Sequence, residues 1–290
     1  MADGIDKLVL LADSIETEFL NFARKRDSSR FGYGHVVDLR RTHYNLSIIL
    51  YCDGLHNGVH KIEVVGVAQL GLRETTRILT IILGRLSRAR IYRIDLCADI
   101  PETWVWDLAE VVLVSRSQNF KIYNSRGGAS FYLRNSADRT ILLYDKVKQL
   151  RAKCDPLAAT FRPGEYLTRI EVQLKGRGVP FKEFRHIHRY ADVDLLGQFH
   201  FRRLKRLRDD AKPLHLLAAG GLRRLIHKYG LHAARKRFSP SQWAYIEKKL
   251  FEVLEGEEIP DLQLRLRRSI NDWLENRIRF PRLELAGNQK

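Results

Sequence analysis

Cysteines, long apolar runs and acidic side chains are all scarce in this chain of 290 residues. Its three cysteines, Cys52, Cys97 and Cys154, lie far apart and lack the paired spacing of a disulfide framework or a thiolate zinc site. We expect them to be reduced and structural. No apolar run approaches the roughly 18 residues of a membrane span, and the first residues lack the features of a secretion signal. The sequence therefore predicts a cytoplasmic protein with no membrane partner.

The chain also lacks a glycine-rich phosphate loop, an internal repeat and a low-complexity tract. The pair Gly127-Gly128 fits the turn of a β-hairpin instead. Nothing in the pattern therefore indicates a nucleotide-binding loop or a repeat architecture.

Positive charge is abundant, because 51 Lys and Arg residues face 34 Asp and Glu residues, a formal net charge of +17. Residues 176–290 account for +11 of this charge and the first 175 residues for +6. A large positive field favours a polyanionic partner, and nucleic acid is a commoner one than an anionic membrane. The alternative is a basic protein with no such partner.

Two kinds of periodicity divide the chain. β-branched or alternating segments predict strands over 5–12, 44–52, 59–67, 91–100, 120–124, 130–134, 140–146 and 166–175. Helical spacing predicts helices over 73–87, 102–114, 243–254 and 262–280, the third beginning at a cap formed by Ser239 and Gln242. We expect an α+β domain over 1–180, an antiparallel sheet backed by helices, followed by a helical, basic region over 181–290.

Alternation along three strands gathers charged side chains on one face. Arg93, Asp95 and Asp99 fall on one side of their strand, and Arg169 and Glu171 on one side of theirs. Glu63 lies on the polar side of a third strand. If these strands are neighbours, their oxygen ligands suit Mg²⁺ or Mn²⁺. The alternative is a solvated sheet face with weak ion pairs.

The strand over 140–146 ends with Tyr144 and Lys146, two residues apart on one face. A tyrosine is a phosphoryl-transfer nucleophile when its proton, with an ordinary pKa of about 10, is removed as the new bond forms. Lys146 would supply nearby positive charge. The alternative is a half-buried strand tyrosine with a structural role.

Four short motifs carry a resemblance to a known family. They are Ile5-Asp6-Lys7-Leu8-Val9-Leu10, Arg93-Ile94-Asp95-Leu96, Thr140-Ile141-Leu142-Leu143-Tyr144-Asp145-Lys146-Val147-Lys148-Gln149 and Arg169-Ile170-Glu171-Val172-Gln173-Leu174-Lys175. In order and spacing they resemble the landmarks of rolling-circle replication initiators, the family of the filamentous-phage gene II nicking-joining protein and the replication-initiation-factor proteins of small Gram-positive plasmids. The resemblance covers roughly residues 1–185.

This resemblance implies a metal-dependent, site-specific DNA strand transferase that nicks one origin strand and stays attached to the 5′ phosphate. Tyr144 matches the nucleophile, Lys146 the lysine that follows it, and Asp95 and Glu171 the acidic motif residues, with Glu63 and Asp99 as further ligand candidates. The wider superfamily implies a ferredoxin-like or RNA-recognition-like core, simple, elaborated or duplicated. The resemblance also implies the partners: the origin DNA, as duplex and as single strand, and a host helicase and polymerase. The implied location is the bacterial cytoplasm.

The tripeptide His186-Ile187-His188 has the His-hydrophobe-His pattern that binds metal in that superfamily. It follows Tyr144 rather than preceding it, and residues 181–185 before it indicate a helix. Side chains at positions i and i+2 of a helix point apart and do not share a metal. We therefore expect two surface histidines.

Residues 201–237 form the densest basic region, with 12 basic and two acidic side chains. Phosphate contact is the expected role, and a charged helix face is the alternative. The candidate DNA contacts are Arg93, Arg169 and Lys148 near the site and Arg202, Arg203, Lys205, Arg206, Arg223, Arg224, Arg235, Lys236 and Arg237 in this region.

Two further functions stay open. One is a non-catalytic, sequence-specific DNA-binding protein on the same scaffold. The other is an RNA-binding module with aromatic residues exposed on its sheet, against which the carboxylates of the central strands argue because they repel a nucleic-acid backbone.

Overall fold

The computed structural model describes residues 3–26, 34–38, 46–51, 59–101, 105, 112–113, 119–125, 128–162, 164–197, 200–204, 212–229, 234–246, 248, 256–258 and 262–277. Free Cys97 is buried and free Cys154 is exposed, so only the former is a core residue. Cys52 lies outside the described residues. None of the helices in these ranges is both long enough and apolar enough to cross a membrane.

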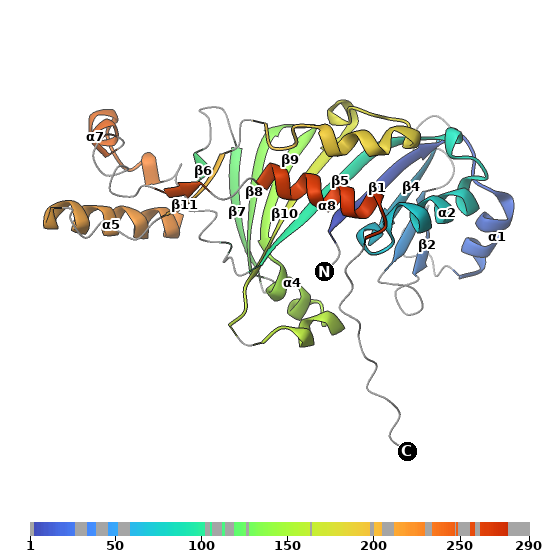
Figure 1. Cartoon of the computed structure of the whole chain (residues 1–290), viewed down its shortest axis with the longest axis horizontal. Helices are drawn as coiled ribbons and strands as arrows, with labels where there is room; N and C mark the ends of the chain where they lie inside the picture. Colours follow the sequence, from blue (N-terminus) through green and yellow to red (C-terminus); the bar gives the residue numbers. More distant parts are fainter. Residues whose placement is uncertain are drawn as a thin grey trace, which may run out of the picture.

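A nine-stranded sheet runs through the centre of the described chain (Figure 1). Its strands in spatial order are β2 (Gly34–Asp38), β3 (Ser47–Tyr51), β4 (His60–Val65), β1 (Gly4–Ala12), β5 (Ala89–Pro101), β10 (Leu167–Lys175), β9 (Arg139–Asp145), β8 (Gly128–Ser136) and β7 (Asn119–Ser125). Every neighbouring pair is antiparallel. The predicted α+β class with an antiparallel sheet is therefore confirmed.

The predicted strands correspond to β1, β3, β4, β5, β7, β8, β9 and β10. The hairpin predicted around Gly127-Gly128 is also confirmed, because Ser125 pairs with Gly128 at the ends of β7 and β8. The edge strand β2 was missed, and the last predicted strand residue of the 140–146 segment, Lys146, begins a helix instead.

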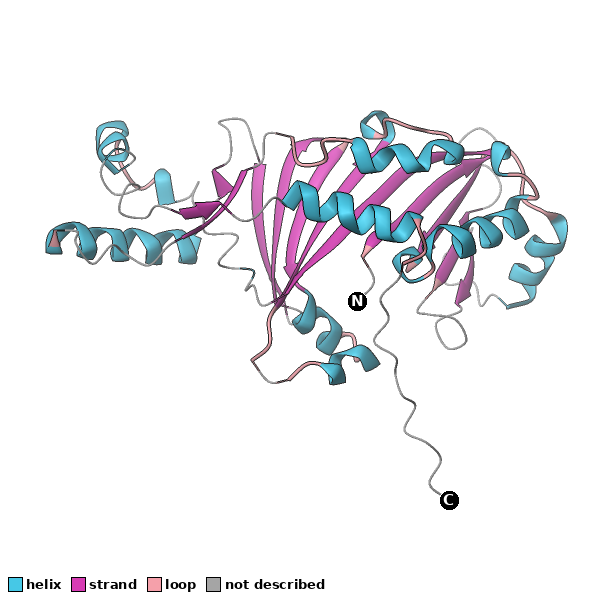
Figure 2. Ribbon diagram, viewed as in Figure 1, coloured by secondary structure: helices cyan, strands magenta, loops and turns pink. Residues whose placement is uncertain are grey.

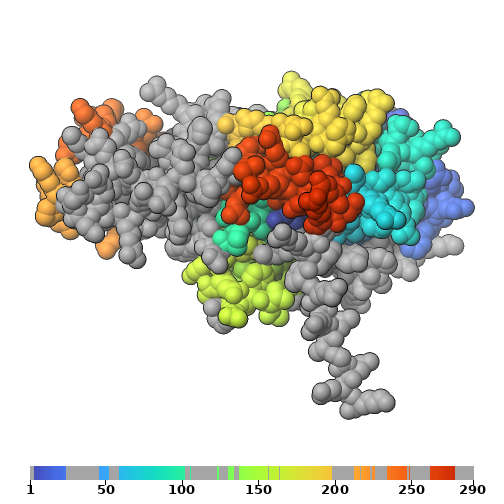
Figure 3. Space-filling model, viewed as in Figure 1, coloured from blue at the N-terminus to red at the C-terminus, as the bar shows by residue number. Residues whose placement is uncertain are grey.

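Helices cover one face of this sheet (Figures 1 and 2). The covering elements are α1 (Thr17–Arg26), η1 (Val67–Gln69), α2 (Gly71–Leu83), η2 (Leu86–Arg88), the 3-10 helix η5 (Phe184–Asp192) and α8 (Leu262–Leu274). Alternate strand residues such as Ile94, Leu96 and Val172 point into this layer and form one hydrophobic core with it. In Figure 3, η5 and α8 lie side by side on this surface.

Helix α8 returns the end of the described chain to the first strand. Its spacing predicts that Leu266, Ile270, Trp273 and Leu274 pack. The first three are at most 1% exposed, Leu274 is partly buried against the core, and the helix lies against β1 and β5. The indole Nε1 of Trp273 donates to the carbonyl of Val67 at 3.0 Å. The predicted boundary at residue 180 therefore does not separate η5 and α8 from the sheet core.

Helical spacing over 73–87 predicts that Ile78, Ile81, Ile82 and Leu86 share the packing face, and all of these except Ile81 pack against the core. Leu79, Ile82 and Leu83 are fully buried, whereas Ile81 is 54% exposed. The buried face of α2 also includes Gly71 and Thr75 near its start. Ile81 was therefore wrongly assigned to the packing face.

Two smaller groups of elements lie outside this core. Helix α4 (Lys146–Ala152) and η3 (Pro156–Thr160) follow β9, and η4 (Gly176–Gly178) follows β10. A three-stranded sheet of β12 (Gly256–Glu258), β11 (His200–Leu204) and β6 (Val112–Leu113) lies beyond β7 in Figure 1, together with α5 (Pro213–Tyr229) and α7 (Pro240–Tyr245). The predicted capping box at Ser239 and Gln242 is confirmed at the start of α7.

The small sheet corrects two helix predictions. Residues 112–113, predicted at the end of a helix, form β6, and Arg202 and Arg203 lie on β11 rather than on a helix. The β11–β12 register sets Arg202 opposite Glu258 and Arg203 opposite Glu257. Cross-strand pairs of opposite charge favour such pairing, and local periodicity contains no sign of a partner more than 50 residues away.

We expect Trp273→Ala to lower the free energy of unfolding by about 3–5 kcal/mol, because it removes a fully buried aromatic ring and leaves a cavity against β1. The close approach of this side chain to Gly4, where an added Cβ would lie 2.5 Å from Cβ of Trp273, leaves little room for the site to collapse. Urea unfolding of the full chain measures the loss. Leu264→Ala, on the same helix but 37% exposed, is the control, and equal losses in the two variants would contradict the packing role.

Candidate active site

The four motif strands are consecutive neighbours in the sheet, in the order β1, β5, β10 and β9. Their register sets Arg169 of β10 between Asp99 of β5 and Tyr144 of β9. Glu171 lies opposite Cys97 on one side and Leu142 on the other. The predicted polar faces of β5 and β10 thus form one continuous surface, opposite the helical layer, with Tyr144 at its β9 side.

Tyr144 is buried on this surface, at 5% exposure. Its hydroxyl donates to Oε2 of Glu171 across 3.4 Å, a long hydrogen bond. Burial raises the pKa of Tyr144 well above its usual value, and Glu171 and Asp6 raise it further, while Arg169 opposes them. The phenol is therefore held protonated, and its reaction requires a proton acceptor in contact with it.

Arg169 is the buried cation at the centre of the surface, at 4% exposure. Its Nε and Nη2 donate to the two carboxylate oxygens of Asp99 at 2.6 and 2.8 Å, and Nη1 donates to Asp6 at 3.4 Å. Burial opposes the charge of Asp99, but Arg169 outweighs it and holds the pKa of Asp99 below its usual value. Such a paired, buried guanidinium fixes β10 against β5.

Asp95 and Glu171 are two buried carboxylates on adjacent strands. Asp95 accepts two hydrogen bonds from Arg93, both at 2.7 Å, yet burial still raises its pKa. Burial, together with the charges of Asp95 and Asp6, raises the pKa of Glu171 to about 7. Oε1 of Glu171 accepts from Gln173 at 2.7 Å, so Oε2 is left facing the Tyr144 hydroxyl.

Lys146 is the first residue of α4, whose cap is Asp145. Its Nζ donates to Oε1 of Gln149 at 3.0 Å and lies 5.8 Å from the centre of the Tyr144 ring. Burial and the neighbouring Arg169 lower the pKa of Lys146 to about 8, against the opposing charges of Asp6 and Asp99. At neutral pH the amine is therefore cationic but exchanges its proton more readily than an ordinary lysine.

Asp6 and Asp3 belong to the same surface and were missed by sequence reasoning. The β1–β5 register shifts between Ile5 and Lys7, so a bulge turns both Asp6 and Lys7 away from the core. The sequence did carry a sign of this bulge: Ile5 and Leu8, both fully buried, are three residues apart, whereas regular alternation would place them on opposite faces. Burial and the nearby Asp99 raise the pKa of Asp3 to about 8, which keeps this carboxyl protonated at neutral pH.

Glu63 lies one strand beyond this cluster, because β1 separates β4 from β5. It is held by Lys7 at 2.7 Å and Lys61 at 2.6 Å. Burial opposes its charge, but these two lysines hold the pKa of Glu63 below its usual value. Glu63 is therefore already neutralised by cations of the chain.

The predicted metal ligands differ in their fit to Mg²⁺ or Mn²⁺. Within the described ranges, no three His, Cys, Asp or Glu side chains stand close enough together to form a metal site. Asp99 is neutralised by Arg169, as Glu63 is by its lysines. Asp95 is likewise paired with Arg93, but its charge still raises the pKa of Glu171, and a divalent cation between hard carboxylate oxygens would relieve that repulsion. Their metal role stays a prediction.

The histidine tripeptide lies on the other side of the sheet from Tyr144. Residues 186–188 belong to η5, a part of the helical layer. Ile187 packs into the core, while His188 is exposed. The segment is helical, as predicted, so its two imidazoles diverge.

The candidate DNA contacts fall into three groups. Arg93 is part-exposed and Lys148, on α4, is half-exposed, whereas Arg169 is buried and presents no surface to a ligand. Exposed members of the basic region are Arg224, Arg235, Lys236 and Arg237. The structure describes only the backbone of Arg202, Arg203 and Arg223, and Lys205 and Arg206 lie outside the described residues.

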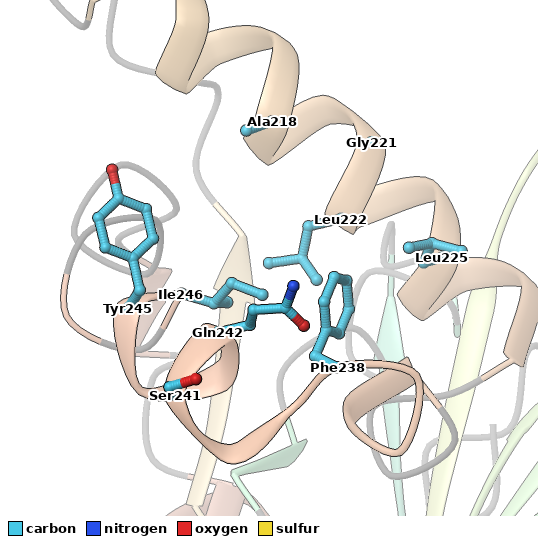
Figure 4. Close-up of a pocket in the computed structure, with 9 residues that line it drawn as sticks. All are labelled: Ala218, Gly221, Leu222, Leu225, Phe238, Ser241, Gln242, Tyr245 and Ile246. Atoms are coloured by element: carbon cyan, nitrogen blue, oxygen red, sulfur yellow. The ribbon is translucent and has the colours of Figure 1, made fainter.

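A separate pocket of about 620 Å³ lies between α5 and α7 (Figure 4). Its walls are mainly apolar, with Leu222, Phe238 and Ile246 among them. The side chain of Gln242, one of its few polar groups, is committed to the cap of α7. This pocket is therefore separate from the candidate active site and contributes none of its named residues.

No protein-family model and no curated protein matches the chain. The geometry of the polar surface is therefore the basis for any activity assigned to the chain.

The raised pKa of Glu171 predicts a pH dependence of stability. The pKa rises from 4.5 to about 7 on folding, so the folded chain holds this proton more tightly and loses stability as Glu171 ionises between these values. We expect Glu171→Gln to remove a loss on the order of 2 kcal/mol between pH 5 and pH 8. Urea unfolding across this range measures it. Glu165→Gln, an exposed carboxylate, should follow the wild-type curve, and parallel curves for Glu171→Gln and wild type would contradict the assignment.

Proposed function

We propose that the protein is a rolling-circle replication initiator that nicks one DNA strand with Tyr144 and later rejoins it. The observation that carries the proposal is the adjacency of β1, β5, β10 and β9. These strands hold the four motifs of the resemblance, although up to 170 residues of chain separate the first motif from the last. If the four matches were chance similarities, their strands would not be expected to lie next to one another in the sheet.

We also infer that the first half of the sheet is an elaborated ferredoxin-like core. In chain order, β1, α1, β3, β4, α2 and β5 follow the strand-helix-strand-strand-helix-strand pattern. In space the strands run β3, β4, β1, β5, all antiparallel, with both helices on one face. The strand β2 at one edge and β10, β9, β8 and β7 at the other would be the elaborations.

In the proposed reaction, the Tyr144 oxygen forms a bond to phosphorus while the bond from phosphorus to the 3′ oxygen breaks. Glu171, with a pKa of about 7 and an oxygen 3.4 Å from the hydroxyl, is placed to accept the phenolic proton. The 3′ oxygen takes a proton from Lys146 or water and leaves as a hydroxyl that primes a polymerase. The phosphotyrosine keeps the energy of the broken bond, so the reverse attack rejoins the strand.

Charge develops on the phosphate oxygens in this step and requires stabilisation. Lys146, cationic at neutral pH, supplies positive charge beside the Tyr144 ring. If Asp95 and Glu171 held a divalent cation, it would add Lewis-acid stabilisation of the same charge, and the phenolic proton would then pass to water rather than to Glu171. Arg169 contributes to the reaction indirectly, because its positive charge opposes the rise in the pKa of Tyr144.

A second candidate function is a non-catalytic DNA-binding protein on the same scaffold. The 5% exposure of Tyr144 favours it, since an attacking hydroxyl has to reach a phosphate. The same positive charge and the same sheet would serve this function without any use of Tyr144.

We expect Tyr144→Phe to abolish nicking while binding to the same DNA stays within a few-fold of wild type, because the hydroxyl attacks but contributes little to binding. The substrate is supercoiled plasmid carrying the DNA that flanks the protein's own gene, with Mg²⁺ or Mn²⁺. Nicked circles that retain protein after SDS measure the reaction. Tyr166→Phe, at an exposed tyrosine just before β10, is the control. Unchanged nicking by Tyr144→Phe would remove Tyr144 as the nucleophile, and no nicking by wild type would favour the second function.

Metal binding has its own test. We expect Asp95→Asn and Glu171→Gln each to weaken Mn²⁺ binding about tenfold or more, because each removes a charged oxygen ligand. Titration calorimetry on the full chain measures the affinity. The double variant His186→Ala with His188→Ala should bind as wild type does, since η5 lies on the opposite face. Loss of Mn²⁺ binding in the histidine variant alone would assign the metal to η5.

A further inference from the structure

An aromatic pair lies on the polar face near Tyr144. Tyr123 of β7 and Tyr132 of β8 meet edge to face, with ring centroids 5.0 Å apart and planes at 80°. Tyr123 is 51% exposed. A half-exposed aromatic ring on a sheet edge contributes little to a core, but it offers a flat apolar face at small entropic cost.

The register ties this pair to the candidate active site. Tyr144 lies opposite Ser130 on β8, and Ser130 lies opposite Tyr123 on β7. Tyr123 is therefore on the same face as Tyr144, two strands away, which is roughly 10 Å at the spacing of neighbouring strands. A few nucleotides bound at Tyr144 would reach this distance.

Glu171 links the two places electrostatically. It accepts the hydrogen bond of Tyr144, and after burial it is the main cause that raises the pKa of Tyr132. Stacking on these rings requires base faces that are exposed, as they are in a single strand. In a duplex those base faces are already stacked on one another and are not available.

We propose that Tyr123 and Tyr132 form a stacking platform for the bases of single-stranded DNA beside the phosphate that Tyr144 attacks. The inference rests on the proposed function and names the form of its substrate. The net charge of +17 supplies the general attraction for DNA. The aromatic pair adds contacts that depend on bases but not on their sequence, because every base has a π-face.

The test compares the full-length protein on three ligands of equal length, about twelve nucleotides: oligothymidylate, an abasic strand and a duplex. We expect Tyr123→Ala and Tyr132→Ala each to weaken oligothymidylate binding roughly 5- to 100-fold, with abasic-strand and duplex binding unchanged. Tyr123→Phe should bind as wild type does, since the ring is kept. Tyr245→Ala, an exposed tyrosine on α7, is the matched control. Fluorescence anisotropy at one fixed salt concentration measures the affinities.

Several outcomes would overturn the platform: unchanged oligothymidylate binding by Tyr123→Ala and Tyr132→Ala, equal loss on the abasic strand, or loss in Tyr123→Phe. Tighter binding of oligouridylate than of oligothymidylate by wild type would assign the surface to RNA instead. The nicking assay separates this inference from the proposed function. If wild type binds single strands through their bases but does not nick, the platform is supported and the initiator is rejected. If wild type nicks but Tyr123→Ala binds oligothymidylate normally, the initiator is supported and the platform is rejected.

Discussion

The buried guanidinium of Arg169 is the charge on which the polar surface depends. It lies between β5 and β9 in the register and is paired in bidentate fashion with Asp99 and more loosely with Asp6. A charge taken out of water is stable only when it is paired, so strands β1, β5 and β10 are held in one arrangement around it. The same cation lowers the pKa of Lys146 and opposes the rise in that of Tyr144.

Charge on the surface is balanced unevenly. Two of the carboxylates have cations of their own, as Glu63 has Lys7 and Lys61 and Asp99 has Arg169. In the middle, Asp95 keeps a raised pKa despite Arg93, and Glu171 is hydrogen-bonded to two neutral groups, the side chains of Gln173 and Tyr144. Glu171, whose hydrogen bonds come from neutral groups, lies beside the Tyr144 hydroxyl, where a proton acceptor or a bound cation would have the largest effect.

The two faces of the sheet differ in composition. The helical layer, completed by η5 and α8, covers the apolar side of the sheet. The polar side extends toward β7, and Figure 1 shows α5 and the small sheet of β6, β11 and β12 beyond that edge. Exposed Arg224 and Lys236 belong to this outer part, so the basic region and the aromatic pair lie toward the same end of the sheet.

For eight of the nine strands of the large sheet, the sequence alone determined strand identity, and on β5 and β10 it also determined side-chain facing, because both follow from a period of two that neighbouring residues carry. Alternation by itself therefore placed Asp95 with Asp99, and Arg169 with Glu171, on shared faces. Tertiary structure decided which strands are neighbours, that a bulge turns Asp6 into the site, and that Trp273 packs against Gly4. It also decided that Arg203 pairs with Glu257 on a strand. These features depend on contacts between residues far apart in the chain, which local periodicity does not contain.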